Sequence, residues 1–434
     1  MWDFSTDPQF QEELDWATRF VHEEVEPVDA VIGHPADVRS PLRAALIRPL
    51  QEQVKRRGLW ACHLGPDLGG PGYGQVKLAL LNEVLGSSRC APTVFGCQAP
   101  DSGNSELLAR FGTADQKRRY LAPLIAGDVV SCFSMTEPHG GADPTGITAR
   151  AELADGTWRL DGEKWFASNA RFADFVIAVV VTDPDGSRHH RASMFIIPAD
   201  TPGLTIIRNV ASAGQPANDG SHGYLRFENL RLGQEQLLGE RGAAFAMAQA
   251  RLGGGRIHHA MRTVGAATKA FDMMCERALS RTSDGRPLAE RQLVQQAIAD
   301  SWLDLAQFRL LVLHTAWLID HKGDYNAVRG DIAAVKAAMP RVLHDIAARA
   351  MQIHGSIGVS DEMPFARLIL ESAQMGLVDG PTEIHKVGLA RAVLKGYEAS
   401  SETFPDYHLP AVRRRARQRF ADVLADHPAD TLWS

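Results

Sequence analysis

The period of the hydrophobic pattern changes twice along this chain of 434 residues. Up to about residue 129, apolar residues recur every three or four positions, which is typical of amphipathic helices. Residues 130–240 instead contain short β-branched and aromatic runs between Pro, Gly and Asn turns, and this predicts strands. The helical period returns over residues 241–398, and residues 399–434 form a polar tail. The sequence therefore predicts an α+β protein, mainly α, with a β domain between two helical domains.

Some elements can be predicted more closely. Residues 42–58 predict a helix with Gly58 as its stop. The glycine-rich loop 65–74 superficially suggests a dinucleotide site, but no predicted strand precedes it and its two prolines lack N–H donors for phosphate. We therefore expect a rigid surface loop there. The pair Asp161-Gly162 predicts a hairpin turn, and the run Phe175–Val181 predicts a buried strand.

Composition and the absence of certain motifs exclude several classes of function. The chain is 45% apolar and 23% charged, as in ordinary soluble proteins, and its net charge of −6 gives no electrostatic reason to bind nucleic acid. The longest apolar run is too short to span a bilayer, and the first residues lack the features of a secretory signal. The five cysteines form no Cys-x-x-Cys pair, and no metal-ligand spacing occurs. We expect a cytoplasmic protein with reduced thiols, no metal site and no membrane span.

Residues 377–386 place a carboxylate, Asp379, between a short apolar run and a Gly-Pro turn. A helical pattern follows, and Thr382 could cap that helix. Desolvation at a helix entrance makes a carboxylate a stronger base, as a general base for a weak carbon acid must be. The local sequence alone favours a simpler interpretation, in which Asp379 is a turn residue that caps the helix.

Other segments carry residues suited to a cofactor site, in a particular order along the chain. They are Phe133-Ser-Met-Thr-Glu-Pro-His-Gly-Gly-Ala-Asp, Gly162-Glu-Lys-Trp-Phe-Ala-Ser-Asn-Ala, Arg251-Leu-Gly-Gly-Gly-Arg-Ile-His-His-Ala-Met-Arg, Gln352-Ile-His-Gly-Ser-Ile-Gly and Asp379-Gly-Pro-Thr-Glu-Ile. With these motifs in this order, the chain resembles the acyl-CoA dehydrogenase family over about residues 1–398. The Arg256-Ile-His-His segment and the aspartate of Asp379-Gly-Pro are most similar to vertebrate family members ten and eleven. The resemblance implies an N-terminal helical domain, a middle β-barrel or sandwich domain and a C-terminal four-helix bundle.

The resemblance also implies FAD, held between the β domain and the C-terminal helices. Positions matching Phe133, Met135 and Thr136 line the flavin in similar proteins, and those matching Phe166 and Ser168 pack on the ring and hydrogen-bond near its N5. The further cofactor positions match Arg281, Gln292, Gln352, Gly355, Ser356, Pro381, Thr382 and Glu383. Singly, the aromatic residues would be strand core and Arg281 a surface charge, but as a set they favour a cofactor site.

The resemblance also implies that a neighbouring subunit contributes to the FAD site. In the family, positions matching Arg281, Gln292 and the 352–356 segment reach the FAD of another subunit, and the permanent charge of Arg281 suits a pyrophosphate. We therefore expect a homodimer or a dimer of dimers.

The implied reaction is the α,β-dehydrogenation of an acyl-CoA to a trans-2-enoyl-CoA, as in fatty acid β-oxidation. Asp379 would take the α-proton, N5 of FAD the β-hydride, and electron-transfer flavoprotein would receive the electrons. The developing enolate needs preorganised donors; in the family these are the backbone N–H of the base residue and a ribityl hydroxyl of FAD. Arg256 matches an arginine that orients the base, with a helix-surface salt bridge as its simpler role, and Gly380 is assigned to substrate binding.

Departures from the family pattern bear on specificity. Asp379 is one methylene shorter than the usual glutamate, which leaves the preferred chain length open. Ala142 replaces a serine hydroxyl that contacts the CoA arm, and Asp284 replaces an aromatic residue that packs on the neighbour's flavin. Beside the FAD diphosphate, Pro381 replaces a small hydroxyl residue and Glu383 an amide.

Two other functions stay open. An acyl-CoA oxidase or a nitroalkane-oxidase-like flavoenzyme would use the same fold, and the latter also has an aspartate base. A DNA-binding flavoprotein is suggested by the arginine run 413–419, although such a run is more simply a solvated helix face and the net charge of −6 argues against it.

Overall fold

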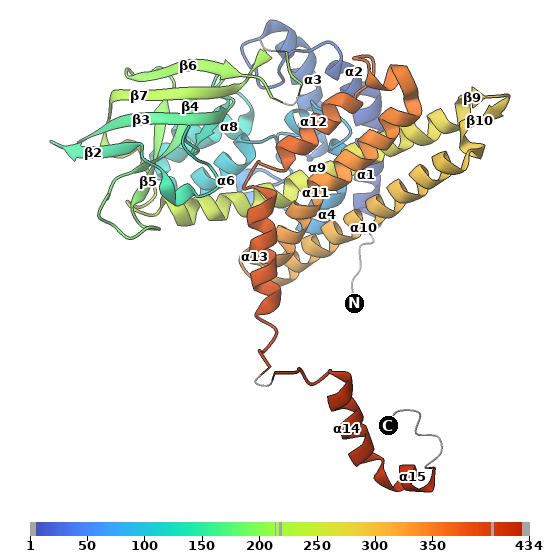
Figure 1. Cartoon of the computed structure of the whole chain (residues 1–434). Coiled ribbons are helices and arrows are strands. Elements are labelled where there is room, and N and C mark those ends of the chain that lie inside the picture. Colours follow the sequence, from blue (N-terminus) through green and yellow to red (C-terminus); the bar gives the residue numbers. More distant parts are fainter. Residues whose placement is uncertain (1–5, 213, 217–218, 401–402, 428–434) are drawn as a thin grey trace. The chain divides into compact units, whose positions relative to one another are not determined.

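The computed structural model describes residues 6–212, 214–216, 219–400 and 403–427. It divides into two compact units, Met1–Val387 and Gly388–Ser434. In the first unit, helices are followed by a sheet and then by helices again, which is the predicted order (Figure 1).

The N-terminal part of the first unit is helical, with local caps that fix where its helices begin and end. Asp7 accepts a hydrogen bond from the backbone N–H of Phe10 at the start of α1, and Gly58 ends α3 with a φ of 78°, as predicted. The predicted surface loop 65–74 contains only a short 3-10 turn, Pro66–Leu68, and follows a helix rather than a strand. The described helices here are α1 (Pro8–Phe20), α2 (Glu26–Asp29), α3 (Pro41–Arg57), α4 (Gln75–Leu85), α5 (Ala91–Val94), α6 (Asp101–Phe111), α7 (Ala114–Gln116) and α8 (Ala122–Ala126), with π-helical turns at Val21–Val25 and Lys117–Leu121.

The middle of the chain forms one mixed, eight-stranded sheet. Its strands run in the order β6-β7-β3-β1-β4-β5-β8, and β2 pairs with β3 and β4. Strand β4 is buried along its whole length, as predicted, because side chains from separate apolar clusters cover both of its faces. The strands are β1 (Ser131–Ser134), β2 (Arg150–Ala154), β3 (Thr157–Ser168), β4 (Phe175–Val181), β5 (Ala192–Pro198), β6 (Leu204–Val210), β7 (His222–Leu232) and β8 (Leu237–Leu238).

The predicted hairpin at Asp161-Gly162 is wrong. Strand β3 runs through this pair, and only a register shift next to Gly162 marks it. The hairpin turn lies at Asp155-Gly156, between β2 and β3, where φ is 51° and 74°. Gly162 is required for another reason: a Cβ there would lie 2.6 Å from Ala149. Both pairs carry the same Asp-Gly signal, so the local sequence could not choose between them.

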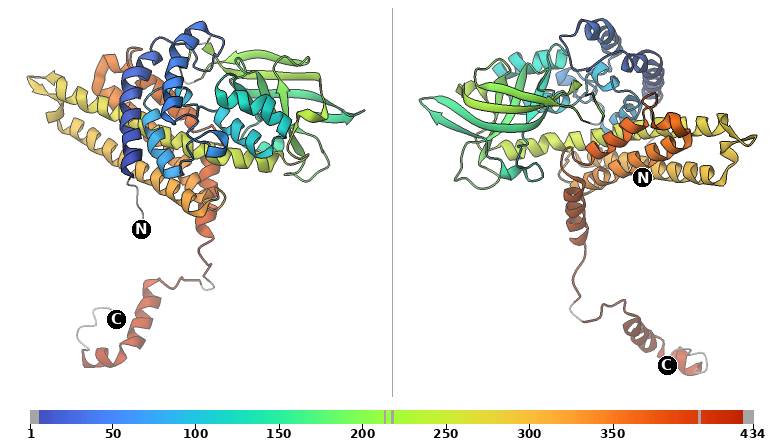
Figure 2. Two further views of the ribbon diagram at one scale, coloured as in Figure 1. Left: turned by 180° about the vertical axis from the view of Figure 1, so that it is seen from behind. Right: turned by 45° about the horizontal axis from the view of Figure 1, so that its top comes forward.

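The C-terminal part of the first unit is a bundle of four helices, α9 (Ala244–Ser280), α10 (Gln292–Lys322), α11 (Arg329–His354) and α12 (Phe365–Met375). Helix α9 is long enough to pass from the sheet to the far end of the bundle, where β9 (Thr282–Ser283) and β10 (Arg286–Pro287) form a small hairpin (Figure 2). Helix α9 also packs closely on α4, because a Cβ on Gly265 would lie only 1.9 Å from the carbonyl oxygen of Glu83.

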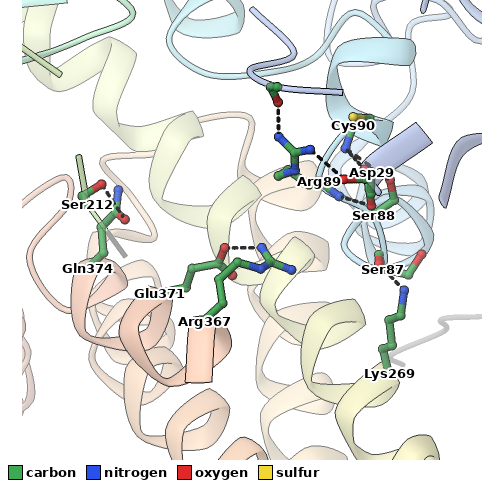
Figure 3. Close-up of polar contacts among 11 residues, drawn as sticks. Asp29, Ser87, Ser88, Arg89, Cys90, Ser212, Lys269, Arg367, Glu371 and Gln374 are labelled. Atoms are coloured by element: carbon green, nitrogen blue, oxygen red, sulfur yellow. Dashed lines mark hydrogen bonds and ion pairs between the residues drawn. The ribbon is translucent and has the colours of Figure 1, made fainter. Parts of the chain in front are cut away.

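Polar contacts tie α12 to the rest of the first unit (Figure 3). Arg367 and Glu371 form an ion pair along α12, and Gln374 accepts a hydrogen bond of 3.3 Å from Ser212, in the loop after β6. Nearby, Arg89 donates hydrogen bonds to carbonyl groups at and beyond the end of α2. Because α12 leads directly into residues 376–381, the hydrogen bond between Ser212 and Gln374 ties the helix end that precedes Asp379 to the loop after β6.

Helix α13 (Thr382–Leu394) begins in the first unit and continues into the second. The second unit contains α14 (Leu409–Arg419), which holds the arginine run, and α15 (Ala421–Asp426). Within the described residues, no helix combines the length and apolar character needed to cross a membrane.

Candidate active site

Asp379 lies in a tight loop between α12 and α13. Its φ is 55°, in the left-handed region, and that of Gly380 is 107°. The loop is closed by Thr382, whose backbone N–H and Oγ1 both donate to the carbonyl of Gly376, at 2.9 and 3.2 Å. Thr382 is thus the first residue of α13, and its hydroxyl donates a hydrogen bond within the loop. It closes the loop instead of capping the helix as predicted.

The Asp379 carboxylate lies against Gly255, the last of three consecutive glycines in α9. A Cβ on Gly255 would sit 3.1 Å from Oδ2 of Asp379, so glycine leaves the room that the carboxylate uses. Oδ2 is also 3.7 Å from Nε2 of His259, and the Asp379 side chain is only 13% exposed. Burial lowers the pKa of His259 to about 4, although Asp379 opposes this shift, so the imidazole is neutral near pH 7.

The backbone of Asp379 is held as firmly as its side chain. Its carbonyl oxygen accepts hydrogen bonds from Nε of Arg256 at 3.0 Å and from Nε2 of His385 at 3.3 Å. Arg256 therefore binds the main chain of the residue whose orientation it is expected to set. The N–H of Asp379 has no acceptor in the described part of the chain, which leaves it available to a ligand.

Cationic side chains surround the same point. Lys336 is fully buried in α11 and donates to the carbonyl of Met375, and burial lowers its pKa to about 8 despite the attraction of Asp379. The guanidinium of Arg251 lies 4.0 Å from the centre of the Phe133 ring, which joins this cluster to the end of β1. An anion that develops beside Asp379 would thus meet a positive field.

Glu106 and Tyr325 place polar groups next to Gly254, the middle glycine of the three in α9. A Cβ on Gly254 would lie 3.5 Å from Oη of Tyr325 and 3.6 Å from Oε2 of Glu106. Burial raises the pKa of Glu106 to about 7, partly opposed by Arg251. Sequence reasoning missed both residues, along with His259, Lys336 and His385. The glycine triplet, which is unusual inside a helix, was the signal that something must approach α9 there.

The predicted flavin-lining segment follows β1 and is held by a buried ion pair. Lys164 and Glu137 are 2.8 Å apart, and both side chains are almost completely buried. Lys164 also donates to the carbonyl of Met135 at 3.0 Å, and the N–H of Trp165 donates to the carbonyl of Thr136 at 2.8 Å. These bonds turn two carbonyls toward β3, and the Thr136 hydroxyl has no partner among the described residues.

Phe166 and Ser168 lie at the end of β3, next to that segment. Phe166 has a φ of 56°, unusual for an aromatic residue, and its ring stacks on His222 with centroids 4.3 Å apart. Ser168 Oγ is hydrogen-bonded to Nδ1 of the same histidine at 3.1 Å, and burial lowers the pKa of His222 to about 4. The structure therefore brings the two predicted residues together around a third that the sequence did not indicate.

The other predicted cofactor residues lie apart from the β domain. Arg281 and Gln292 flank the β9–β10 hairpin, which lies at the end of the bundle remote from the sheet (Figure 2). The 352–356 positions, which are Gln352, Gly355 and Ser356, stand exposed where α11 ends. Pro381 and Glu383 simply flank Thr382. That Arg281, Gln292 and the 352–356 positions serve a second copy stays a prediction.

A basic pocket opens between the start of α9 and loops of the β domain. It is small, with a cavity volume of about 20 Å³, and Met135 and Phe245 line it. Arg188, His189 and Arg191 also line it, and the His189 ring lies 4.5 Å from that of Phe245.

Comparison with known proteins agrees with this architecture. Residues 8–128, 132–230 and 240–394 match models of the N-terminal, middle and C-terminal domains of acyl-CoA dehydrogenases. Probable acyl-CoA dehydrogenase FadE2 of Mycobacterium tuberculosis is 42% identical over 364 residues, which cover 83% of this chain and 88% of that protein. Human acyl-CoA dehydrogenase family member 11 is 37% identical over 355 residues, 81% of this chain but 45% of that protein, so the chain spans less than half of this relative.

Solved structures give the same result. A Mycobacterium abscessus protein assigned as an acyl-CoA dehydrogenase superposes with a TM-score of 0.83 at 36% identity, covering 91% of this chain and all of that one. Butyryl-CoA dehydrogenase from Megasphaera elsdenii superposes with a TM-score of 0.77 at 26% identity, over 91% of this chain and all of that one. Together, the three domain matches, the order of the motifs and the shared fold place this chain in the acyl-CoA dehydrogenase family, next to family members ten and eleven.

Proposed function

We propose that this protein is an FAD-dependent acyl-CoA dehydrogenase in which Asp379 removes the α-proton of an acyl-CoA thioester. One observation carries the proposal: the carboxylate of Asp379 lies in the space left by Gly255, while the N–H of the same residue has no partner in the described chain. A base and a donor for the developing enolate oxygen are thus offered by a single residue.

The residues of the β domain fit a flavin. The Thr136 hydroxyl lacks a partner in the described chain, its carbonyl is turned away toward Trp165, and the Phe166 ring is 37% exposed. Phe133, Met135, Thr136, Phe166 and Ser168 would hold the ring. When bound, FAD supplies the two-electron acceptor for the reaction.

The protein's own residues divide the remaining work. Asp379 accepts the α-proton at a carboxylate oxygen, and its N–H binds the thioester oxygen as negative charge grows there. Arg251 and Arg256 keep the local field positive, which favours that charge over the neutral ground state. The low exposure of the Asp379 side chain limits competition from water.

The basic side chains near the start of α9 are our candidates for the phosphate groups of a CoA arm. Arg188, His189 and Arg191 lie beside Met135, and guanidinium groups are good partners for phosphate, although Arg188 is paired with Asp143 in this structure. Electron-transfer flavoprotein is the proposed acceptor of the electrons, and a homodimer or dimer of dimers the proposed assembly.

An anaerobic titration tests the proposal. We expect the purified protein to show flavin absorbance and to bleach with at least one acyl-CoA in a panel from short to long chains. Absence of flavin, or absence of bleaching with every acyl-CoA, would reject the proposal. Rapid peroxide formation in air would instead indicate an oxidase, and bleaching by a nitroalkane without CoA would indicate the nitroalkane-oxidase type.

A further inference from the structure

We propose that His385 is a positioning residue for the base: with Arg256 it clamps the carbonyl of Asp379 and thereby sets where the carboxylate and the N–H of Asp379 point. The inference rests on the proposed role of Asp379 as the base.

The clamp is built from two helices. Arg256 reaches the carbonyl from α9 and His385 from the first turns of α13, at 3.0 and 3.3 Å. Asp379 adopts a left-handed φ of 55°, a conformation that is unfavourable in a residue other than glycine. Rotation of the peptide plane between Asp379 and Gly380 would break both hydrogen bonds, so the clamp selects this conformation over its alternatives.

The clamp also defines the state of the imidazole. A carbonyl oxygen only accepts, so Nε2 of His385 must carry the hydrogen and the ring need not be charged. Burial, and next Arg256, lower the pKa of His385 to about 4, while Asp379 opposes the shift and Lys336 adds to it. The ring is therefore a neutral donor near pH 7.

Gly380 makes the approach of the ring possible. A Cβ on Gly380 would lie 3.1 Å from Nε2 of His385, a tighter contact than side chains normally make. The φ of 107° at Gly380 is likewise open mainly to glycine. Asp379, Gly380 and His385 are thus matched parts of one arrangement, which their sequence spacing alone does not reveal.

The clamp gives a physical meaning to the short side chain. Asp379 has one fewer rotatable bond than the glutamate usual at this position, so its carboxylate follows any rotation of the backbone more directly. Fixing the peptide plane therefore fixes the base itself, and a displacement of about 1 Å can cost roughly 100-fold in rate.

Three variants of the FAD-loaded protein test the clamp. His385→Leu removes the donor, His385→Gln keeps an N–H donor, and His344→Gln changes an exposed histidine of α11 as a matched control. For each we would measure the single-turnover rate of flavin reduction by acyl-CoA, the acyl-CoA dissociation constant, FAD content and the melting temperature. Amide hydrogen exchange over residues 376–384 would report on the loop without relying on turnover.

We expect His385→Leu to slow flavin reduction by roughly 10- to 100-fold, with the dissociation constant changed less than about 3-fold. Exchange over residues 376–384 should become several-fold faster. His385→Gln should recover most of both losses, and His344→Gln should show neither. Wild-type flavin reduction and exchange in His385→Leu, or a His385→Gln variant no better than His385→Leu, would overturn the clamp.

The two proposals fail in different ways. If no acyl-CoA reduces the wild-type flavin, the proposed reaction is wrong, and the exchange measurement still decides on the clamp. If the wild type is active but neither amide exchange nor the rate of flavin reduction changes in His385→Leu, only the clamp is wrong.

Discussion

At the scale of single residues, the site depends on how one aspartate is held. Its carboxylate occupies room left by Gly255, and its carbonyl is fixed by Arg256 and His385. The nearest rival carboxylate in sequence, Glu383, is exposed on α13. The two can be separated by experiment.

We expect Asp379→Asn to keep FAD and acyl-CoA binding but to lose turnover by several orders of magnitude, because an amide cannot accept the α-proton. Stopped-flow reduction of the flavin measures this, and equilibrium titration with acyl-CoA measures binding. The matched change Glu383→Gln should retain proton abstraction. Normal turnover in Asp379→Asn would reject the assignment of the base.

Glu106 should make stability depend on pH. Burial raises its pKa to about 7 in the folded protein, against an ordinary value of 4.5. The folded state therefore binds more protons than the unfolded state between pH 4.5 and 7, so the contribution of Glu106 to stability is present below pH 4.5 and is lost as the pH rises through 7.

We expect the difference in unfolding free energy between Glu106→Gln and the wild type to shift by about 2–3 kcal/mol in favour of the variant when the pH is raised from 5 to 7.5. Denaturant unfolding at the two pH values measures the change, with the exposed Glu290→Gln as control. An equal effect of Glu106→Gln at both pH values would contradict this account.

At the scale of elements, the buried pair of Lys164 and Glu137 joins β3 to the segment after β1. The pair also anchors the backbone of Met135, so stability and the shape of the flavin site depend on the same contact. Removal of one partner of a buried pair costs more than removal of both, since a lone buried charge remains.

We expect Glu137→Gln to cost about 3–5 kcal/mol of unfolding free energy and to weaken FAD binding. The pKa of Lys164, already lowered by burial to about 8, would fall further, so the lysine of the variant becomes neutral below pH 8 and the penalty relative to the wild type should shrink as the pH rises toward 8. The double variant Glu137→Gln with Lys164→Met should lose less than Glu137→Gln alone. Unfolding curves and flavin titrations provide both measurements, and a double variant worse than the single one would refute the argument.

Individual elements also show which parts of the fold and of the site could be predicted from the sequence. Periodicity predicted α3 almost to the residue, because this helix buries one apolar stripe. The hairpin was misplaced because only tertiary contact with Ala149 distinguishes Gly162 from Gly156. In the site, Asp379 and Arg256 were found from motifs, whereas Lys336 and His385 carry no local signal. Their importance arises from α11 and α13 meeting one loop, which is information about packing.

At the scale of the whole molecule, α10 carries large apolar side chains that its own bundle does not cover. Trp302 is 58% exposed, and Leu303 and Leu310, which lie on neighbouring positions of the helix surface, are 49% and 55% exposed. A stripe that is apolar but uncovered fits the proposed assembly with a second copy, which would also bring Arg281 and Gln292 to a neighbour's FAD.

We expect the protein to be a dimer or a dimer of dimers by light scattering, and Trp302→Glu to dissociate it with loss of FAD, because burial of a charge in such an interface is unfavourable. Substitution of the buried Phe308 would unfold the bundle instead. Because Trp302 is exposed, its substitution tests assembly without disturbing folding. A monomeric wild-type protein that is fully loaded with FAD would contradict the proposal.

The three consecutive glycines of α9 have a consequence for engineering this protein. Each glycine inside a helix costs about 1 kcal/mol relative to alanine, so a simple search for stabilising substitutions would begin at positions 253–255. A methyl group there meets Tyr325, Glu106 or Asp379. At positions 253 and 255 a substitution that stabilises the helix would therefore press on Tyr325 or Asp379, so stability and activity oppose each other at one turn of one helix.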